Sequence, residues 1–155
     1  MATLQQVSVA LEQAVKNEGN PEETTTQFDF VISRTGTTDA ALEVDWELQV
    51  AGTNPAEIDD LASGQPTVGT VVFEANVLEQ TVSVLLAGDI AVEADEQFTL
   101  ALIGNGLPAG TTLDTASAVA TISNDDPTVT ISPSLVQALD EGNPGGDPTI
   151  FSYTL

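Results

Sequence analysis

Four carboxylates and no basic residue lie within the short segment AGDIAVEADEQFTL at residues 87–100. They belong to Asp89, Glu93, Asp95 and Glu96. Carboxylates held close together repel one another, so a fold that gathers them must protonate some of them or share a cation among them. A hard divalent cation suits this arrangement, because Ca²⁺ takes about 6–8 oxygen ligands from carboxylates and main-chain carbonyls in a flexible geometry. The segment therefore indicates a calcium site.

Two other acidic segments, EGNP at residues 18–21 and NDDP at residues 124–127, extend this candidate site. No EF-hand loop is present, so the ligands would have to come from separate loops. Asp95 and Glu96 are expected outside the metal shell, with one of them accepting hydrogen bonds from main-chain amides at the start of the next strand. The candidate ligands are Glu18, Asp89, Ala91 by its main-chain carbonyl, Glu93, Asp125 and Asp126.

The composition narrows the class of protein. The chain carries 24 acidic residues against only Lys16 and Arg34, for a formal charge of −22. This excludes nucleic acid as a partner, since phosphate binding needs basic side chains, and it disfavours an anionic membrane surface. Cysteine and histidine are absent, which rules out disulfides, imidazole bases and conventional zinc sites. With no activated nucleophile and one Trp and one Tyr for sugar stacking, the sequence predicts that the chain is not an enzyme.

The elements that must position the carboxylates are predicted to be β-strands. In ALEVDWELQV, at residues 41–50, apolar and polar residues alternate, which is typical of a half-buried strand and places Trp46 in the core. Only residues 56–62 could form a turn or two of helix. About seven such strands, separated by Gly, Asn, Asp and Pro, predict an all-β fold: a seven-stranded antiparallel β-sandwich of the Ig-like, Greek-key type. The other strand segments are QQVSVAL, FDFVISR, GTVVFE, TVSVLLA, FTLALI and ASAVATI.

This architecture predicts where the acidic segments lie. The chain reverses at each antiparallel strand, so loops separated by an even number of strands gather at the same end of the sandwich. The three acidic segments follow the first, fifth and seventh predicted strands. We therefore expect them to converge at one pole, where the chain leaves the domain.

The sequence also repeats. EGNPEETTTQFDFVI at residues 18–32 recurs as EGNPGGDPTIFSYTL at residues 141–155, with the same motif, spacing and facing pattern. The chain is therefore predicted to consist of one complete unit at residues 1–127 and the truncated start of a second at residues 128–155. The parent protein is predicted to be a tandem array, in which NDDP forms a tight hinge and not a long linker.

These segments carry a resemblance to a known family. EGNPEE, FDFVISRTG, GTVVFE, GDIAVEADEQFTLAL and ATISNDD resemble the motifs of Calx-beta domains over roughly residues 4–127, with a partial copy after them. Calx-beta domains are seven-stranded sandwiches found in sodium/calcium exchangers, an integrin β subunit and long bacterial surface proteins. The resemblance implies that the early Glu, the acidic loop and the terminal Asp run supply calcium ligands. These positions fall on Glu18, Asp89, Ala91, Glu93, Asp125 and Asp126.

The sequence departs from the strongest calcium binders of that family in three places. Their acidic loop opens with consecutive aspartates, whereas Gly88 precedes Asp89 here, and their terminal run has three aspartates, whereas Asn124 stands first here. The loop after the Trp46 strand, QVAGTNP, also lacks the Asp that those members have there. The resemblance therefore implies fewer ions or weaker binding. Asp59 and Asp60 match a further family aspartate.

We expect a calcium-binding structural module of a repetitive extracellular or cell-surface protein, in which calcium orders the loops and stiffens the junction between units. The partners would be calcium ions and neighbouring repeats, with no membrane insertion, and any export signal would lie outside the sequence. One alternative is a head-to-tail filament, in which strands at 129–135 and 149–155 complete a neighbour's sheet. Another is a calcium-bridged glycan-binding module, which the scarcity of aromatic residues disfavours.

Overall fold

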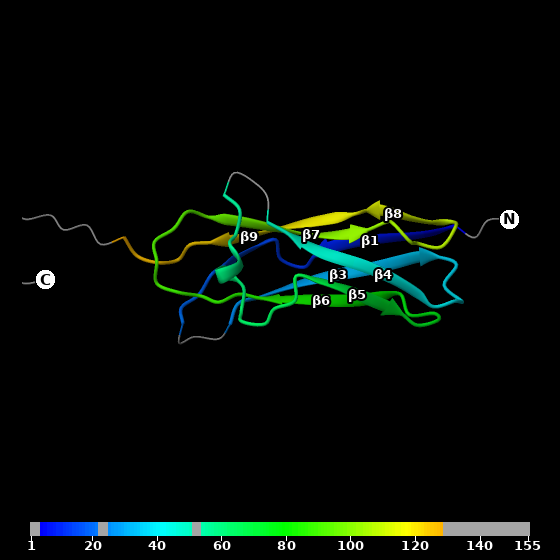
Figure 1. The fold of residues 1–155 in the computed structure, drawn as a ribbon, viewed down its shortest axis with the longest axis horizontal. Coiled ribbons are helices and arrows are strands. Elements are labelled where there is room, and N and C mark those ends of the chain that lie inside the picture. Colours follow the sequence, from blue (N-terminus) through cyan, green and yellow to red (C-terminus); the bar gives the residue numbers. More distant parts are fainter. Residues whose placement is uncertain (1–3, 22–24, 51–53, 129–155) are drawn as a thin grey trace, which may run out of the picture.

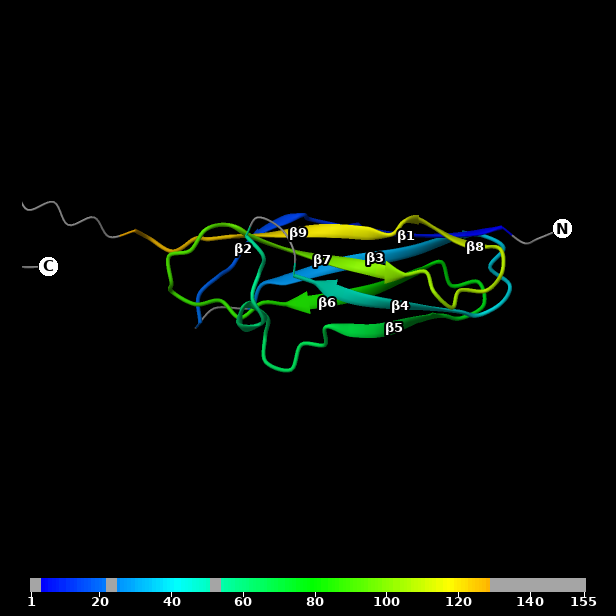
Figure 2. The ribbon, with the colours of Figure 1, turned by 45° about the horizontal axis from the view of Figure 1, so that its top comes forward.

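The computed structural model describes residues 4–21, 25–50 and 54–128 and shows an all-β sandwich (Figures 1 and 2). The predicted all-β sandwich is thereby confirmed. The only helical element among these residues is a single 3₁₀ turn, η1 (Ile58–Asp60), within the stretch predicted to be helical. No helix in this part of the chain is long and apolar enough to cross a membrane. The strands are β1 (Gln5–Leu11), β2 (Val15–Asn17), β3 (Gln27–Gly36), β4 (Leu42–Gln49), β5 (Val68–Phe73), β6 (Glu79–Leu85), β7 (Glu96–Ile103), β8 (Thr111–Thr115) and β9 (Ser117–Ser123).

The strand count differs from the predicted seven because both ends of the domain pass from one sheet to the other. One sheet has the order β6-β3-β1-β8 and the other β2-β9-β7-β4-β5. The predicted strand QQVSVAL is β1 and the predicted strand ASAVATI lies in β9, whereas β2 and β8 are two short additional strands, each at the edge of the sheet that does not contain its neighbour in sequence. The pairs β1·β8 and β2·β9 are parallel, whereas every other pair of strands is antiparallel.

The core lies between the sheets and follows the alternation read from the sequence. Phe28 and Phe30 of β3 are fully buried, and both meet Phe98 of β7 in the opposite sheet. The Phe28 and Phe98 rings meet edge to face at 5.4 Å between centroids, a preferred aromatic geometry. Trp46 is buried as predicted and faces Gly69 across the β4·β5 pair, where a Cβ would lie 2.7 Å from the indole ring. Aromatic contacts between the sheets therefore fix the frame that carries the loops.

The described chain begins at one end of the sandwich and leaves at the other (Figure 1). We call these ends the N-terminal pole, formed by the loops at 37–41, 74–78 and 104–110, and the C-terminal pole, formed by residues 18–21, 25–26, 54–67, 86–95 and 124–128. The predicted second unit lies outside the described residues apart from Thr128.

Arg34 holds the loops of the N-terminal pole together. It lies on the same face of β3 as Phe28 and Phe30 and is only 1% exposed. Its guanidinium group has five N–H donors in one plane, and it donates to four main-chain carbonyls that belong to two loops. It also lies 5.3 Å from the centroid of the Phe73 ring. The four acceptors belong to Thr38, Ala40, Glu74 and Val77.

Candidate metal centre

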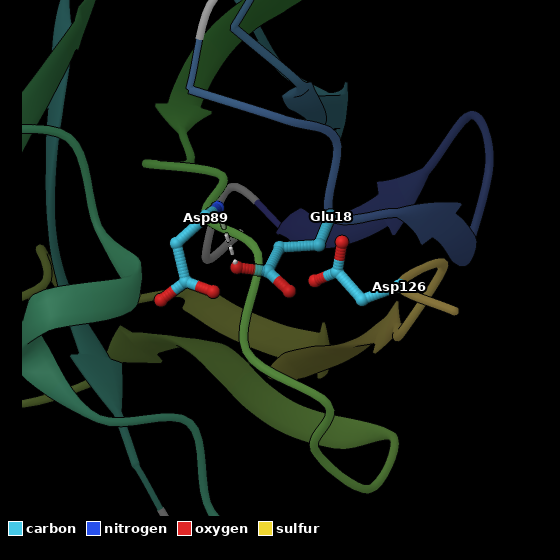
Figure 3. Close-up of side chains that lie close together, drawn as sticks. All are labelled: Glu18, Asp89 and Asp126. Carbon is cyan, nitrogen blue, oxygen red and sulfur yellow. Dashed lines mark hydrogen bonds between the residues drawn. The ribbon is translucent and has the colours of Figure 1, made fainter. Parts of the chain in front are cut away.

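Three loops that are distant in sequence meet at the C-terminal pole and bring three carboxylates together. Oxygen atoms of Glu18, Asp89 and Asp126 lie within 4.8 Å of one another (Figure 3). Glu18 follows β2, Asp89 lies between β6 and β7, and Asp126 follows β9. These are the three acidic segments expected to converge, and the structure brings together three of the six predicted ligands.

The Glu18 carboxylate is held in place by the main chain. Glu18 is only 4% exposed. Its Oε1 accepts a hydrogen bond of 3.2 Å from the amide of Asp89, and its own amide donates to the Ser123 carbonyl at 3.0 Å. Figure 3 shows the first of these bonds crossing from the β6–β7 loop to the β2–β3 loop. One residue thus ties together all three loops.

The two loops can approach this closely because Gly88 has no side chain. A Cβ at Gly88 would lie 2.1 Å from the Gly19 carbonyl oxygen, closer than real Cβ contacts occur. Gly19 itself has a φ of +90°, a conformation that glycine adopts without strain. The glycine that directly precedes Asp89 is therefore required by the contact beside the carboxylates.

We predict that Gly88→Ala separates Glu18 from Asp89. The added methyl group must push the 18–20 loop away, which should cost about 1–3 kcal/mol of unfolding free energy and weaken cation binding. Urea unfolding and calorimetric titration with Ca²⁺ measure the two effects. Gly104→Ala at the opposite pole is the matched control, because its nearest neighbour, Leu113 Cδ1, would lie at an ordinary contact distance of 3.4 Å. Equal effects of the two variants would contradict the proposed loop contact.

Asp126 brings an unpaired oxygen to the cluster. Its amide donates to Asn124 Oδ1 at 2.7 Å, which fixes the turn, but its Oδ2 is buried and has no hydrogen-bond partner. An oxygen in this position normally finds a donor or a cation. Burial raises the pKa of Asp126, and the neighbouring Asp125 and Asp89 raise it further. Burial likewise raises the pKa of Glu18, with repulsion from Asp89 as the next cause.

A second group of carboxylates lies beside the first. Oxygens of Asp60, Glu93 and Glu96 come within 4.8 Å of one another. Burial, the hydrogen bond to Asp60 and repulsion from Asp60 raise the pKa of Glu96 to about 7, while burial followed by repulsion from Asp89 raises the pKa of Glu93. A small cavity of about 10 Å³ lies beside this group and is lined by its three residues and by Glu18 of the first group. That volume is roughly the space that one water molecule or ion occupies.

Asp60 and Glu96 are not among the ligands predicted from the sequence, and Glu96 was expected outside the metal shell, whereas its carboxylate lies in this group. Glu96 has the same parity in β7 as the buried Phe98, Leu100 and Leu102, so the alternation itself pointed it inward. Asp60 has a weaker signal, because its position depends on long-range contacts of η1. Its carbonyl accepts from the Ala87 amide at 2.8 Å, and Leu61 pairs with Leu86.

Three other residues of the C-terminal pole, Asp125, Ala91 and Asp95, connect its loops by hydrogen bonds. Asp125 accepts from the Gly19 amide at 3.1 Å and from Asn17 Nδ2 at 3.3 Å. The Ala91 carbonyl accepts from Asn124 Nδ2 at 3.3 Å. Asp95 or Glu96 was expected to accept hydrogen bonds from main-chain amides at the start of the next strand. Asp95 does accept from a main-chain amide, but this amide belongs to Asn124, which follows β9. As metal ligands, all six residues stay predictions, namely Glu18, Asp89, Ala91, Glu93, Asp125 and Asp126.

The raised pKa values give the metal-free domain an unusual dependence on pH. A carboxyl group with a raised pKa in the folded state stabilises the fold below its unfolded pKa, near 4.5 for Glu96, and this contribution is lost as the pH rises through about 7. In EDTA we expect the melting temperature to fall over this range, and to fall less in Glu96→Gln. Scanning calorimetry from pH 4.5 to 7.5 measures this, and identical profiles for the two proteins would contradict it.

Comparisons with known proteins address the fold. No family model matches the chain, and no curated protein matches it significantly. Among solved structures, the apo-form Calx CBD1 domain is 21% identical, with a TM-score of 0.62, over 79% of this chain and 99% of that one. The Calx CBD2 domain is 12% identical, with a TM-score of 0.56, over 77% and 86% of the two chains. The chain has the Calx CBD fold. The resemblance to Calx-beta domains is thereby confirmed for the architecture.

A longer chain of the same type also matches. CBD12 of CALX1.1, described as a calcium binding domain, is 22% identical with a TM-score of 0.56, over 79% of this chain and 44% of that one. The chain thus spans less than half the length of that protein. At these identities the Calx likeness shows the fold, and the acidic pole has to be interpreted from its own geometry.

Proposed function

We propose that this Calx-like domain binds calcium at its C-terminal pole, and that Glu18, Asp89 and Asp126 hold the ion. The observation that supports this most directly is the buried Asp126 Oδ2, which has no hydrogen-bond partner and belongs to a trio of carboxylates within 4.8 Å. A divalent cation would give that oxygen a partner and would remove the repulsion that raises the pKa values of Glu18 and Asp126.

The chemistry of the donors favours calcium over other metals. Every donor is an oxygen atom, and the sequence has no histidine or cysteine to attract zinc or copper. The carboxylates come from separate loops, and such a site adapts more easily to the irregular coordination of Ca²⁺ than to the strict octahedron of Mg²⁺. Asp60, Glu93 and Glu96 line the same cavity and would hold a second ion beside the first.

The proposed consequence of binding is mechanical. The ion would join the loops after β2, β6 and β9 at the pole where the chain leaves the domain. In a tandem array it would order those loops and stiffen the junction with the next unit. We propose this role for a repetitive protein of the cell surface or extracellular matrix. CBD12 of CALX1.1, which is described as a calcium binding domain, supports the calcium part of the proposal.

Calorimetric titration and melting of the full chain test this proposal. We expect heat on adding Ca²⁺ and a higher melting temperature, because a ligand that binds only the folded state adds about 2.7 kcal/mol at a hundredfold excess over its Kd. Mg²⁺ at the same concentration is the control and should give a much smaller shift. A chain that shows no heat and an unchanged melting temperature with Ca²⁺ would refute the proposed function.

A further inference from the structure

We propose that the domain carries tension along its long axis, and that the parallel pairs β1·β8 and β2·β9 form a clamp that resists sliding of the first strands past the last. The clamp follows from the strand topology and needs no ion, so this inference goes beyond the calcium site. Its setting, a repetitive protein that is pulled from both ends, rests on the proposed function.

A pull on the chain acts on the domain from two opposite ends. The described chain enters the N-terminal pole at Leu4 and leaves the C-terminal pole at Thr128, so tension between these residues runs along the strands (Figures 1 and 2). Because β1·β8 and β2·β9 are parallel pairs, the β1–β2 segment and the β8–β9 segment point in the same direction. Tension therefore pulls the two segments in opposite directions along one axis, and the hydrogen bonds between them oppose this sliding.

A ladder loaded in this way differs from one that is peeled. Hydrogen bonds between strands run across the strands, perpendicular in antiparallel pairs and slanted in parallel ones. A pull along the strands therefore loads the whole ladder together, whereas a pull across one end loads only the outermost bond, which is weak by itself. Forced unfolding depends on the rate of unfolding. The same ladder should thus withstand a higher force in shear than in peeling.

The two strands that receive the load lie inside their sheets. β1 lies between β3 and β8, and β9 lies between β2 and β7. Withdrawal of β1 must break the antiparallel ladder with β3, from Gln5↔Gly36 to Leu11↔Phe30, together with the pairing to β8. The short strands β2 and β8 thereby acquire a mechanical function, because each pairs with the side of a loaded strand that would otherwise be an edge.

Gln5 fastens the clamp at the N-terminal pole. It is the first residue of β1 and is only 9% exposed, although its side chain is polar. Its amide donates to the Gly110 carbonyl at 2.9 Å, and its Nε2 donates to the Thr37 carbonyl at 2.6 Å. Its Oε1 accepts from Thr111 Oγ1 at 3.3 Å, and its carbonyl accepts from Thr112 Oγ1 at 3.4 Å. The first strand residue that tension reaches is thus bonded to β8 and to a neighbouring loop.

Further hydrogen bonds extend the β2·β9 pairing beyond the ends of β2. The Thr121 amide donates to the Ala14 carbonyl, before β2, at 2.8 Å. The Glu18 amide donates to the Ser123 carbonyl, after β2, at 3.0 Å. The Asp125 carboxylate adds its two hydrogen bonds to the same segment. The clamp is therefore fastened at both poles.

Single-molecule force spectroscopy with two pulling directions tests the clamp. The sequence contains no cysteine, so pairs of introduced cysteines can attach handles to the full chain at chosen exposed positions. Leu4→Cys with Thr128→Cys gives a shear chain, which loads the clamp along its length. Leu4→Cys with Ala109→Cys gives a peel chain, in which β1 and the start of β8 are pulled apart at one pole.

In EDTA and at the same loading rate, we expect the shear chain to unfold at a force several-fold higher than the peel chain. Urea unfolding of both chains checks that the substitutions leave their equilibrium stability alike. Equal forces in the two directions, or a lower force for the shear chain, would overturn the proposal.

Three variants of the shear chain locate the resistance. Gln5→Met removes the side-chain hydrogen bonds of the clamp and should lower the unfolding force. Gln6→Met makes the same change at the exposed neighbouring position and should not. Val71→Ala shortens a buried side chain of β5, an edge strand outside the load path, so it should lower stability in urea without lowering the force. If Val71→Ala lowered the force as much as Gln5→Met, the force would report overall stability and the clamp would be overturned.

The same chains distinguish the clamp from the proposed function. Calorimetric heat with Ca²⁺ but equal forces in the two directions would overturn the clamp and leave the calcium site intact. A several-fold higher force for the shear chain in EDTA, with no heat on adding Ca²⁺, would support the clamp and refute the proposed function.

Discussion

A chain carrying Glu18→Gln will lose most of its calcium affinity and yet become more stable without calcium. The loss should be about a hundredfold or more, because the substitution removes a charged ligand from the centre of the trio. The gain follows from burial, since an ionised Glu18 that is only 4% exposed and faces Asp89 destabilises the metal-free fold at pH 7. Calorimetric titration and urea unfolding in EDTA measure the two opposite effects.

Glu79→Gln serves as the control for Glu18→Gln. It makes the same chemical change at an exposed position at the start of β6, far from the acidic pole. It should change neither calcium affinity nor stability by more than about 0.5 kcal/mol, the usual effect of a surface substitution. If Glu18→Gln lowered the stability of the metal-free chain, Glu18 would be a structural residue and not a carboxylate held ready for a cation.

Arg34→Met will destabilise the domain by about 4 kcal/mol or more, with or without calcium. The substitution removes four hydrogen bonds from a charged donor, each worth about 1.5–3 kcal/mol. The carbonyls of Thr38 and Glu74 still accept from the main-chain amides of Asn76 and Val77. The methionine side chain keeps the packing against Phe73 but supplies no N–H group. Urea unfolding of the full chain measures the loss.

Two further variants show whether the hydrogen bonds of Arg34 carry this effect. Arg34→Lys keeps the charge but has only three donors on a flexible stem, so it should recover part of the stability. Lys16→Met removes the only other basic residue, whose Nζ donates to a single carbonyl, that of Gln27, and it should cost about 1 kcal/mol or less. Comparable losses for Arg34→Met and Lys16→Met would show that net charge decides stability, in contradiction of this account.

Much of the fold could be predicted because a strand alternates strictly. Trp46 was expected to face the core from parity alone, and it does; Phe28 and Phe30 of the predicted strand FDFVISR follow the same alternation and are buried as well. The same rule, applied to the direction of successive strands, predicted that the segments of Glu18, Asp89 and Asp126 meet at one pole. Parity also places two charged residues on buried faces, because Arg34 continues the buried face of β3 and Glu96 that of β7, although Glu96 was expected outside the metal shell.

Features that depend on contacts between distant segments could not be predicted in this way. The passage of the first strand from one sheet to the other, between Leu11 and Val15, has no local signature, because its cause is the pairing of β2 with β9. Asp60 joins the second group of carboxylates because η1 is fastened to the β6–β7 loop. The tie from Asp125 to the Gly19 amide likewise exists only once the two loops are side by side.

A crystal structure of the full chain grown with calcium tests the central claim most directly. The account predicts an anomalous peak that is bound by oxygens of Glu18, Asp89 and Asp126 at about 2.3–2.6 Å, the usual range for calcium. In the same structure Asp126 Oδ2, which has no hydrogen-bond partner at present, should be one of the ligands. Calcium bound elsewhere on the domain, with these three carboxylates free of metal, would contradict the account.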